Sequence, residues 1–269
     1  MTASLEIAAK AVAGWLKEAG RPLVVGICGA QGSGKSALAT RLEAHFNAKG
    51  VATCILSLDD FYLPREKRPV DVHPLFATRG VPGTHDVAAI MAVIDALARN
   101  EPALVPRFDK AADAPLPEHE WRREARPVDL VLVEGWCIGA RPQGEDALGQ
   151  PVNDLERDSD GEGLWRRHVN DALRGDYAAL FGRLDKLILL AAPGFDIVRT
   201  WRGQQENGLR NRLRREGREG THVMSEAGIA AFIQHYQRLT VHILHEMPGR
   251  ADLVISLDRY RRPRSVKRR

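Results

Sequence analysis

Apolar runs and longer amphipathic stretches alternate along the chain. The amphipathic stretches 4–19, 85–99 and 225–247 carry apolar residues at helical spacing, and Ser225 is the expected N-cap of the last one. The apolar runs are continuous rather than alternating, which is typical of parallel strands buried on both faces. We predict strands at 23–28, 51–58, 128–133, 187–191 and 253–257. The pattern predicts an α/β fold with a central, mostly parallel sheet covered by helices.

Two stretches interrupt this alternation. Residues 102–127 are rich in proline and charge, and we expect a loop long enough to be functional. Residues 141–163 are polar and acidic, and we expect a surface insertion there. At 269 residues the chain can form one large domain with a lid.

Composition narrows the classes of protein that fit. Hydrophobic residues make up 44% and charged residues 28%, which is ordinary for a globular protein. No apolar run approaches the roughly 18 residues of a membrane span, and residues 4–19 lack the pattern of a signal peptide. Cys28, Cys54 and Cys137 show no metal-binding spacing and are expected to be reduced core residues. We therefore expect a cytoplasmic protein with no membrane partner.

The basic isoelectric point of about 9.1 has a local origin. Residues 259–269 contain seven of the 39 Lys and Arg and no acidic residue, so the preceding residues hold 32 basic against 35 acidic side chains. We expect a solvated, frayed tail; a tail that binds polyanions is the alternative. The charge does not favour nucleic acid as a partner, and the oligomeric state stays open.

Residues 29–36 read GAQGSGKS and match the phosphate-binding pattern G-x-x-x-x-G-K-[ST]. A predicted strand precedes them, and Leu38, Leu42 and Phe46 follow at helical spacing. Glycines let consecutive backbone N–H groups converge on phosphate oxygens, and the helix N-terminus adds partial positive charge. In such a loop the lysine reaches the terminal phosphates and the last hydroxyl ligates Mg²⁺. The predicted nucleotide-binding residues are Gly29, Gln31, Gly32, Ser33, Gly34, Lys35 and Ser36.

Acidic residues end two more of the predicted strands. In an open parallel sheet, ligands bind beyond the carboxyl ends of the strands. Asp59 and Asp60 follow the second strand, where a carboxylate could accept the proton of an attacking hydroxyl or simply begin a turn. Glu134 ends the third strand and could direct a carboxylate at Mg²⁺, although strands often end in Glu.

Five motifs occur in order along the chain: GAQGSGKS (29–36), SLDDFY (57–62), RGVPGTHD (79–86), PRFDK (106–110) and VLVEGW (131–136). Together they resemble the P-loop small-molecule kinases, a group that includes uridine kinase, phosphoribulokinase and bacterial pantothenate kinase. The series is most similar to the D-glycerate 3-kinase family. Segments WRGQQE (201–206) and MSE (224–226) also resemble that family, and the resemblance spans residues 23–257.

The resemblance implies a P-loop NTPase three-layer fold with a helical lid, and a role for each site residue. Asp59 is implied as the base, with Lys35 and Glu134 also catalytic and with Ser36, Glu134 and Asp59 at the metal. It implies one kinase domain over 1–258, with acceptor-side loops at about 59–86 and 102–127 and a lid at about 203–224. Arg210 and Arg214 are the implied lid contacts to the phosphates. The implied acceptor-binding residues are Tyr62, Arg79, His85, Asp86, Arg107, Asp109 and Lys110.

Three functions remain open from the sequence. The first is a kinase that uses ATP and Mg²⁺ to phosphorylate a small hydroxy acid, D-glycerate to 3-phosphoglycerate. The second is a nucleoside or pantothenate kinase of the same group. The third is a P-loop ATPase or regulatory protein that contacts polyanions through its tail; the Asn-Lys-x-Asp motif of GTPase switches does not occur. A carboxylate-bearing acceptor requires cations, which Arg79, Arg107 and Lys110 could supply.

Overall fold

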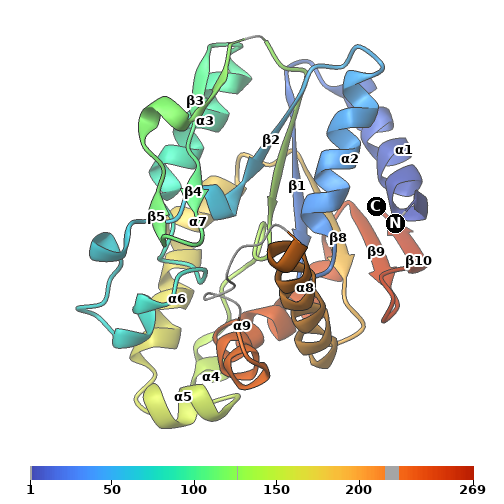
Figure 1. Cartoon of the computed structure of the whole chain (residues 1–269). Coiled ribbons are helices and arrows are strands. Elements are labelled where there is room, and N and C mark those ends of the chain that lie inside the picture. The colour runs from blue at the N-terminus through green and yellow to red at the C-terminus, as the bar shows by residue number, and fades with distance from the viewer. Residues whose placement is uncertain (1, 126, 216–223) are drawn as a thin grey trace.

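A six-stranded sheet in the order β10-β9-β8-β1-β7-β2 forms the centre of the protein (Figure 1). The computed structural model describes residues 2–125, 127–215 and 224–269. Strands β2, β7, β1, β8 and β9 are parallel, and β10 pairs with β9 antiparallel. The five parallel strands are those predicted, so the α/β fold with a mostly parallel sheet is confirmed. The strands are β1 (Leu23–Gly29), β2 (Thr53–Ser57), β7 (Leu130–Gly135), β8 (Lys186–Ala191), β9 (Leu253–Leu257) and β10 (Pro263–Arg268).

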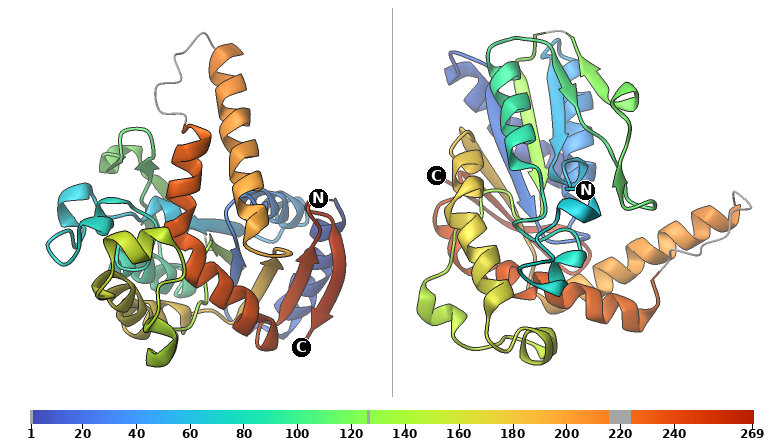
Figure 2. Two further views of the ribbon diagram at one scale, coloured as in Figure 1. Left: turned by 90° about the horizontal axis from the view of Figure 1, so that it is seen from below. Right: turned by 90° about the vertical axis from the view of Figure 1, so that its left-hand side faces the viewer.

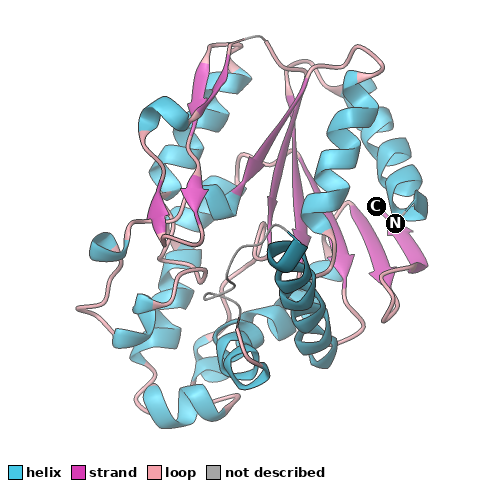
Figure 3. Ribbon diagram, viewed as in Figure 1, coloured by secondary structure: helices cyan, strands magenta, loops and turns pink. Residues whose placement is uncertain are grey.

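Helices cover both faces of the sheet (Figures 1 and 3). Successive residues of a strand point to opposite faces, so Val25 and Ile27 pack with α1 and α2, whereas Val24 and Cys28 pack toward α3, α6, α7 and α9. This burial on both sides explains why the strands are apolar throughout. Ser225 caps α9 by accepting from the Gly228 N–H at 3.1 Å, as predicted. The helices are α1 (Thr2–Glu18), α2 (Lys35–Asn47), α3 (Val87–Ala98), α4 (Glu145–Leu148), α5 (Asp154–Ser159), α6 (Leu164–Arg174), α7 (Asp176–Phe181), α8 (Asp196–Arg215) and α9 (Glu226–Glu246).

Within the proline-rich stretch, residues 103–124 form two short antiparallel strand pairs, one nested inside the other, rather than one long loop. Strand β3 (Ala103–Val105) pairs with β6 (Arg122–Glu124), and β4 (Phe108–Asp109) pairs with β5 (Ala114–Pro115). These strands are only two or three residues long, too short to show a periodic pattern in the sequence.

Two predictions about the polar segments are wrong. The basic tail is not frayed, because residues 263–268 form β10 against β9. The stretch 141–163 is more than a surface insertion, because Glu156 and Asp160 in it are buried. Glu156 pairs with Arg238 of α9, and Asp160 pairs with Arg166 of α6.

The cysteines agree with their expected role as core residues. Cys28, Cys54 and Cys137 are all free and buried, and burial raises the pKa of the Cys28 thiol to about 12. In the part of the chain that the structure describes, we find no helix with the length and apolarity needed to cross a bilayer.

Candidate active site

The phosphate loop joins the end of β1 to the start of α2. Gly32 and Gly34 have φ angles of 77° and 94°, a region that favours glycine. A Cβ added to Gly32 would lie 2.6 Å from the Cβ of Trp201, so this position also lacks space for a side chain. No side chain caps α2 at Gly34, which leaves its first N–H groups available to an anion. This cradle fits the phosphates of a nucleotide.

Glu134 lies beside the loop at the end of β7. The register of β2 and β7 places Ser57 next to Glu134, and Oε1 of Glu134 accepts from Ser57 Oγ at 2.8 Å and from Ser36 Oγ at 3.0 Å. Glu134 is buried, and its Oε2 has no hydrogen-bond partner among the described residues. A hydroxyl beside an unpartnered carboxylate oxygen fits Mg²⁺, which keeps several waters and takes few protein ligands. Within the described ranges, no three His, Cys, Asp or Glu gather as a metal cluster.

Asp59 follows β2 and is held by two side chains. Its Oδ1 accepts from the Tyr62 hydroxyl at 2.6 Å, and its Oδ2 accepts from Lys110 Nζ at 2.7 Å. Burial opposes ionisation of Asp59, but the charges of Lys110 and Lys35 and these two hydrogen bonds hold its pKa well below its usual range. Asp59 is therefore a fixed carboxylate near the phosphate loop.

A cleft of about 1020 Å³ connects the phosphate loop to the segments that were predicted to bind the acceptor. Its floor carries Lys35 and Asp59, and its walls come from the β4–β5 hairpin and from helices α8 and α9. The size and mixed lining suit small charged ligands. The cleft brings together eight of the predicted residues: Gln31, Lys35, Asp59, Tyr62, Arg79, Arg107, Asp109 and Lys110.

Arg79 is the most firmly held cation of this cleft. It forms an ion pair with Asp113, which also pairs with the buried Arg68 at 2.7 Å, and it donates to the Lys110 carbonyl at 2.9 Å. Its guanidinium lies 5.7 Å from the ring centre of Tyr62 and 5.4 Å from that of Phe108. The cation therefore covers two aromatic rings of the acceptor side.

The backbone carbonyls of Arg79 and Gly80 are held by two side chains from distant parts of the sequence. The Tyr236 hydroxyl donates to the Arg79 carbonyl at 2.9 Å, and Trp136 Nε1 donates to the Gly80 carbonyl at 2.7 Å. Gly80 has a φ of 122°, and a Cβ there would lie 2.3 Å from the Tyr236 hydroxyl. These contacts direct the Arg79 side chain into the cleft.

The structure does not place His85 and Asp86 in the cleft lining, contrary to the prediction. His85 is buried behind Tyr62, on which it stacks at 4.7 Å, and it shares a hydrogen bond with the Tyr177 hydroxyl. Burial lowers the pKa of His85 to about 3 and keeps the ring neutral. Asp86 is exposed and caps α3 by accepting from the Ala89 N–H at 2.9 Å.

Asp109 does line the cleft, but its carboxylate is used locally. It accepts from the Ala111 and Ala112 N–H groups at 2.8 and 3.1 Å, and these bonds lower its pKa. Asp109 therefore shapes the turn that presents Lys110.

Of the two predicted lid arginines, the structure describes the side chain of Arg210 alone, and it lies outside the cleft lining. Arg210 donates to Asn207 at 2.8 Å and does not line the cleft; the side chain of Arg214 and residues 216–223 lie outside the described residues. Helix α8 instead presents Arg202 to the cleft from its first half, before it projects from the body (Figure 2). Arg202 pairs with the buried Glu206, and its Nε has no partner within the described ranges.

Several cleft residues were missed from the sequence. Trp136, Arg202 and Glu206 lie in segments that resemble kinase motifs, so the signal was present, although no role was assigned. Asp113 sits in the predicted functional loop. Tyr236 has the helical spacing of a core residue, and nothing in the sequence distinguishes its hydroxyl from that of a purely structural tyrosine.

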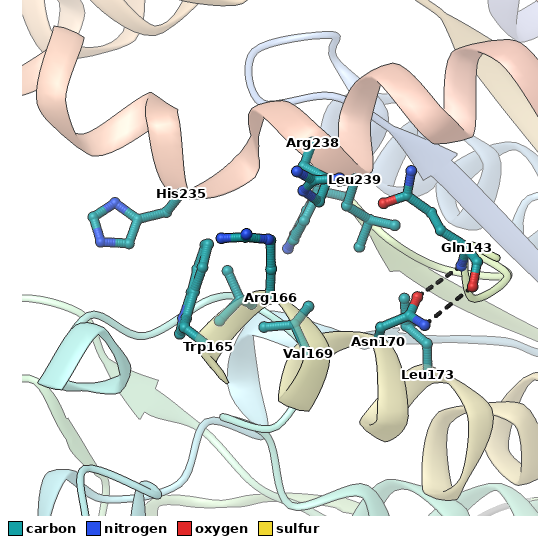
Figure 4. Close-up of a pocket in the computed structure, with 11 residues that line it drawn as sticks. Gln143, Trp165, Arg166, Val169, Asn170, Leu173, His235, Arg238 and Leu239 are labelled. Atoms are coloured by element: carbon teal, nitrogen blue, oxygen red, sulfur yellow. Dashed lines mark hydrogen bonds between the residues drawn. The ribbon is translucent and has the colours of Figure 1, made fainter. Parts of the chain in front are cut away.

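A second pocket beside the cleft does not provide an alternative site (Figure 4). It lies between α6 and α9, and its interior of about 20 Å³ has space for about one water. Its two arginines are paired with Asp160 and Glu156, and Asn170 exchanges hydrogen bonds with the backbone of Gln143 at 2.7 and 3.1 Å. Its polar groups hold helices together.

The fold and the phosphate loop define a nucleotide-binding protein of the P-loop class, and comparison with known proteins agrees. The chain belongs to the P-loop kinases, in the group that includes D-glycerate 3-kinase and uridine kinase. It is 31% identical over 265 residues to a protein of Schizosaccharomyces pombe named uncharacterized kinase mug58. The aligned region covers 91% of this chain and 91% of that protein. No family model matches the chain.

Two further relatives carry a more specific name. The chain is 27% identical over 230 residues to the chloroplastic D-glycerate 3-kinase of Arabidopsis thaliana, covering 80% of this chain and 46% of that protein. The fold superposes on a solved D-glycerate 3-kinase from Cryptococcus neoformans with a TM-score of 0.79 at 24% identity, over 99% of each chain.

Proposed function

We propose that this protein uses ATP and Mg²⁺ to phosphorylate a small hydroxy acid, D-glycerate on its 3-hydroxyl, to give 3-phosphoglycerate. The observation that carries the choice of an acid is the position of Arg79 over the rings of Tyr62 and Phe108. A nucleoside acceptor needs free aromatic faces for stacking, and here a guanidinium covers the rings of Tyr62 and Phe108. A carboxylate, by contrast, gains charge-assisted hydrogen bonds from Arg79, Arg107 and Lys110.

Asp59 is the proposed base. Phosphoryl transfer depends on positioning and on charge stabilisation, so the base has to face the transferring phosphoryl group across a short gap. Asp59 and Lys35 share the cleft, and the charge of Lys35 acts on the pKa of Asp59. Asp59 accepts the proton of the acceptor hydroxyl as its oxygen attacks the γ-phosphorus of ATP, and ADP leaves.

Lys110 links acceptor binding to the strength of this base. A carboxylate whose pKa is well below the usual range is a weak base. An acceptor carboxylate near Lys110 competes with Asp59 for its ammonium group. Once Lys110 turns to the acceptor, Asp59 loses its nearest positive charge and becomes a stronger base. An acidic acceptor therefore improves the base that activates it.

The remaining groups act on the phosphates. Lys35 places its charge on the transferring group, and Arg202 adds a second cation from α8. Mg²⁺ held at Ser36 and Glu134 would supply further positive charge to the nucleotide phosphates.

An acceptor panel with base variants tests the proposal. Full-length protein is incubated with MgATP and, separately, D-glycerate, L-glycerate, uridine or pantothenate, and ADP formation and the ³¹P spectrum of the product are measured. We expect 3-phosphoglycerate from D-glycerate and little turnover of the neutral nucleoside. Asp59→Asn should lose most turnover yet still bind MgATP, whereas Asp60→Asn, the neighbouring carboxylate, should lose less. Phosphorylation of uridine or pantothenate without any of glycerate would overturn the acceptor; native turnover in Asp59→Asn would overturn the base.

A further inference from the structure

The turn between β9 and β10 is a rigid element beside the phosphate loop. Asp258 Oδ1 accepts from the N–H groups of Tyr260 and Arg262 at 2.7 and 2.9 Å, and Asp258 Oδ2 accepts from Arg262 Nε at 2.8 Å. Arg261 sits in this turn with a φ of 63°, a left-handed conformation that is strained for a residue with a side chain. The hydrogen bonds of Asp258 hold Arg261 in that conformation.

Arg261 reaches the phosphate loop. Its Nε donates a hydrogen bond to the carbonyl oxygen of Gly32, although the two residues are 229 positions apart. Its guanidinium carbon lies 5.0 Å from the ring centre of Trp201, within the range of a cation–π contact. Arg261 is half-buried, unlike its exposed neighbours Tyr260 and Arg262.

Trp201 of α8 completes the contact from the other side. Its ring is buried, and its Nε1 donates to the Arg259 carbonyl of the same turn at 2.9 Å. Its Cβ also sets the space in which Gly32 lies. The loop, helix α8 and the turn therefore meet at Gly32.

We propose that Arg261 is a positioning residue of the phosphate loop, which it holds in its nucleotide-binding conformation through the Gly32 carbonyl. Gly32 has no side chain that could restrict its backbone, so an anchor has to come from outside the loop. Neither Arg261 nor Gly32 lines the cleft that contains Lys35; Arg261 lines a small pocket behind the loop with Ser33 and Gly34, so the carbonyl that it binds lies outside the cleft. A carbonyl turned into the cleft would present partial negative charge to the nucleotide and weaken its binding. The inference rests on the proposed use of ATP.

Arg261→Gly is the most informative variant. Glycine adopts a φ of 63° without strain, so the turn should stay folded while the guanidinium is lost. The control is Arg264→Ala in β10, an exposed arginine near the turn. Arg261→Lys keeps a charged donor and should restore part of the function. Binding of MgADP is measured by calorimetry, which needs no acceptor, and KM values are measured with the acceptor found above.

We expect Arg261→Gly to raise the dissociation constant for MgADP and the KM for ATP about tenfold, the loss expected for one charge-assisted hydrogen bond. The KM for the acceptor should stay unchanged, the melting temperature should stay near the native value, and Arg264→Ala should match the native protein. A folded Arg261→Gly protein with native affinity for MgADP would overturn the inference. A variant whose only change is a lower kcat, in proportion to the loss of folded protein, would also overturn it. If no acceptor is phosphorylated, the MgADP titration still tests the role of Arg261.

Discussion

In the proposed mechanism, the contact between Lys110 and Asp59 serves both acceptor binding and catalysis. Lys110 is exposed and lies on a turn that Asp109 stabilises, so it can move, whereas Asp59 is fixed at the end of β2 and also bonded to Tyr62. The mobile partner is therefore the one that could follow the acceptor. Because Lys110 affects the pKa of Asp59, removing Lys110 should change how kcat/KM depends on pH.

Replacing Lys110 with Met should shift the acid limb of the kcat/KM profile to higher pH. The proposed base, Asp59, would act in its ionised form, and Lys110 lowers its pKa. Without the ammonium group the pKa of Asp59 rises toward the ordinary value of about 3.9, so the acid limb of kcat/KM shifts to higher pH. The KM for the acceptor should rise roughly 10- to 150-fold, the loss of one charge-assisted contact. Rate profiles of both proteins from acid to neutral pH check this; an acid limb at the native pH would contradict it.

Also at the residue scale, the sequence predicts a site residue best where its place in a strand or loop determines which way its side chain points. Lys35 and Glu134 were predictable as site residues because a phosphate loop and a strand end place them at the carboxyl edge of the sheet. His85 and Asp86 are the last two residues of an equally distinctive motif, but His85 bonds to Tyr177 and Asp86 caps α3 instead. Proximity to a motif in sequence does not give the direction of a side chain.

At the scale of elements, helix α5 shows that a polar segment can be part of the interior. Glu156 is fully buried and forms two hydrogen bonds with Arg238 of α9, at 2.8 and 2.7 Å. Arg238 also donates to the Gln150 carbonyl at 2.6 Å. The pattern of residues 141–163 predicts exposure because a sequence does not show that two opposite charges 82 positions apart will meet.

Glu156→Ala should therefore destabilise the protein strongly. Removing one partner of a buried ion pair leaves the other charge uncompensated, which costs about 3–5 kcal/mol of the free energy of unfolding. Asp158→Ala, two residues along the same helix, removes only an exposed pair with Arg157 and should cost at most about 1 kcal/mol. Urea denaturation of the two variants measures the difference. Equal free energies of unfolding for the two variants would show that the buried pair stabilises the protein no more than the exposed pair.

At the scale of the whole molecule, the predictable part of the fold is the part that is buried on both faces. All five parallel strands are visible as apolar runs because helices cover them on each side. Strand β10 was missed because it lies at the edge, where proline, lysine and arginine are suitable residues and an apolar pattern is absent. The same residues led to the prediction of a frayed tail.

Deleting residues 263–269 tests what this edge strand contributes. The deletion removes β10 but keeps Arg261, so affinity for MgADP should stay within about threefold of the native value, well below the tenfold loss expected for one charge-assisted bond. The apolar strand β9 becomes the edge of the sheet, so the melting temperature should fall and aggregation on warming should increase. Calorimetry, thermal denaturation and light scattering measure these three effects. An unchanged melting temperature would mean that β10 is dispensable.

The contact between Arg261 and Gly32 also has a consequence for synthesis of the protein on the ribosome. The two residues are 229 positions apart, so at roughly 5–20 residues per second the loop exists for about 10–50 s before its partner is made. During that time the strands that flank β1, including β8, also have still to be translated. Under the proposed role of Arg261, the growing chain therefore binds nucleotide about tenfold more weakly than the finished protein until this turn is made. The full affinity for nucleotide is then acquired late in translation, after most of the sheet has been made.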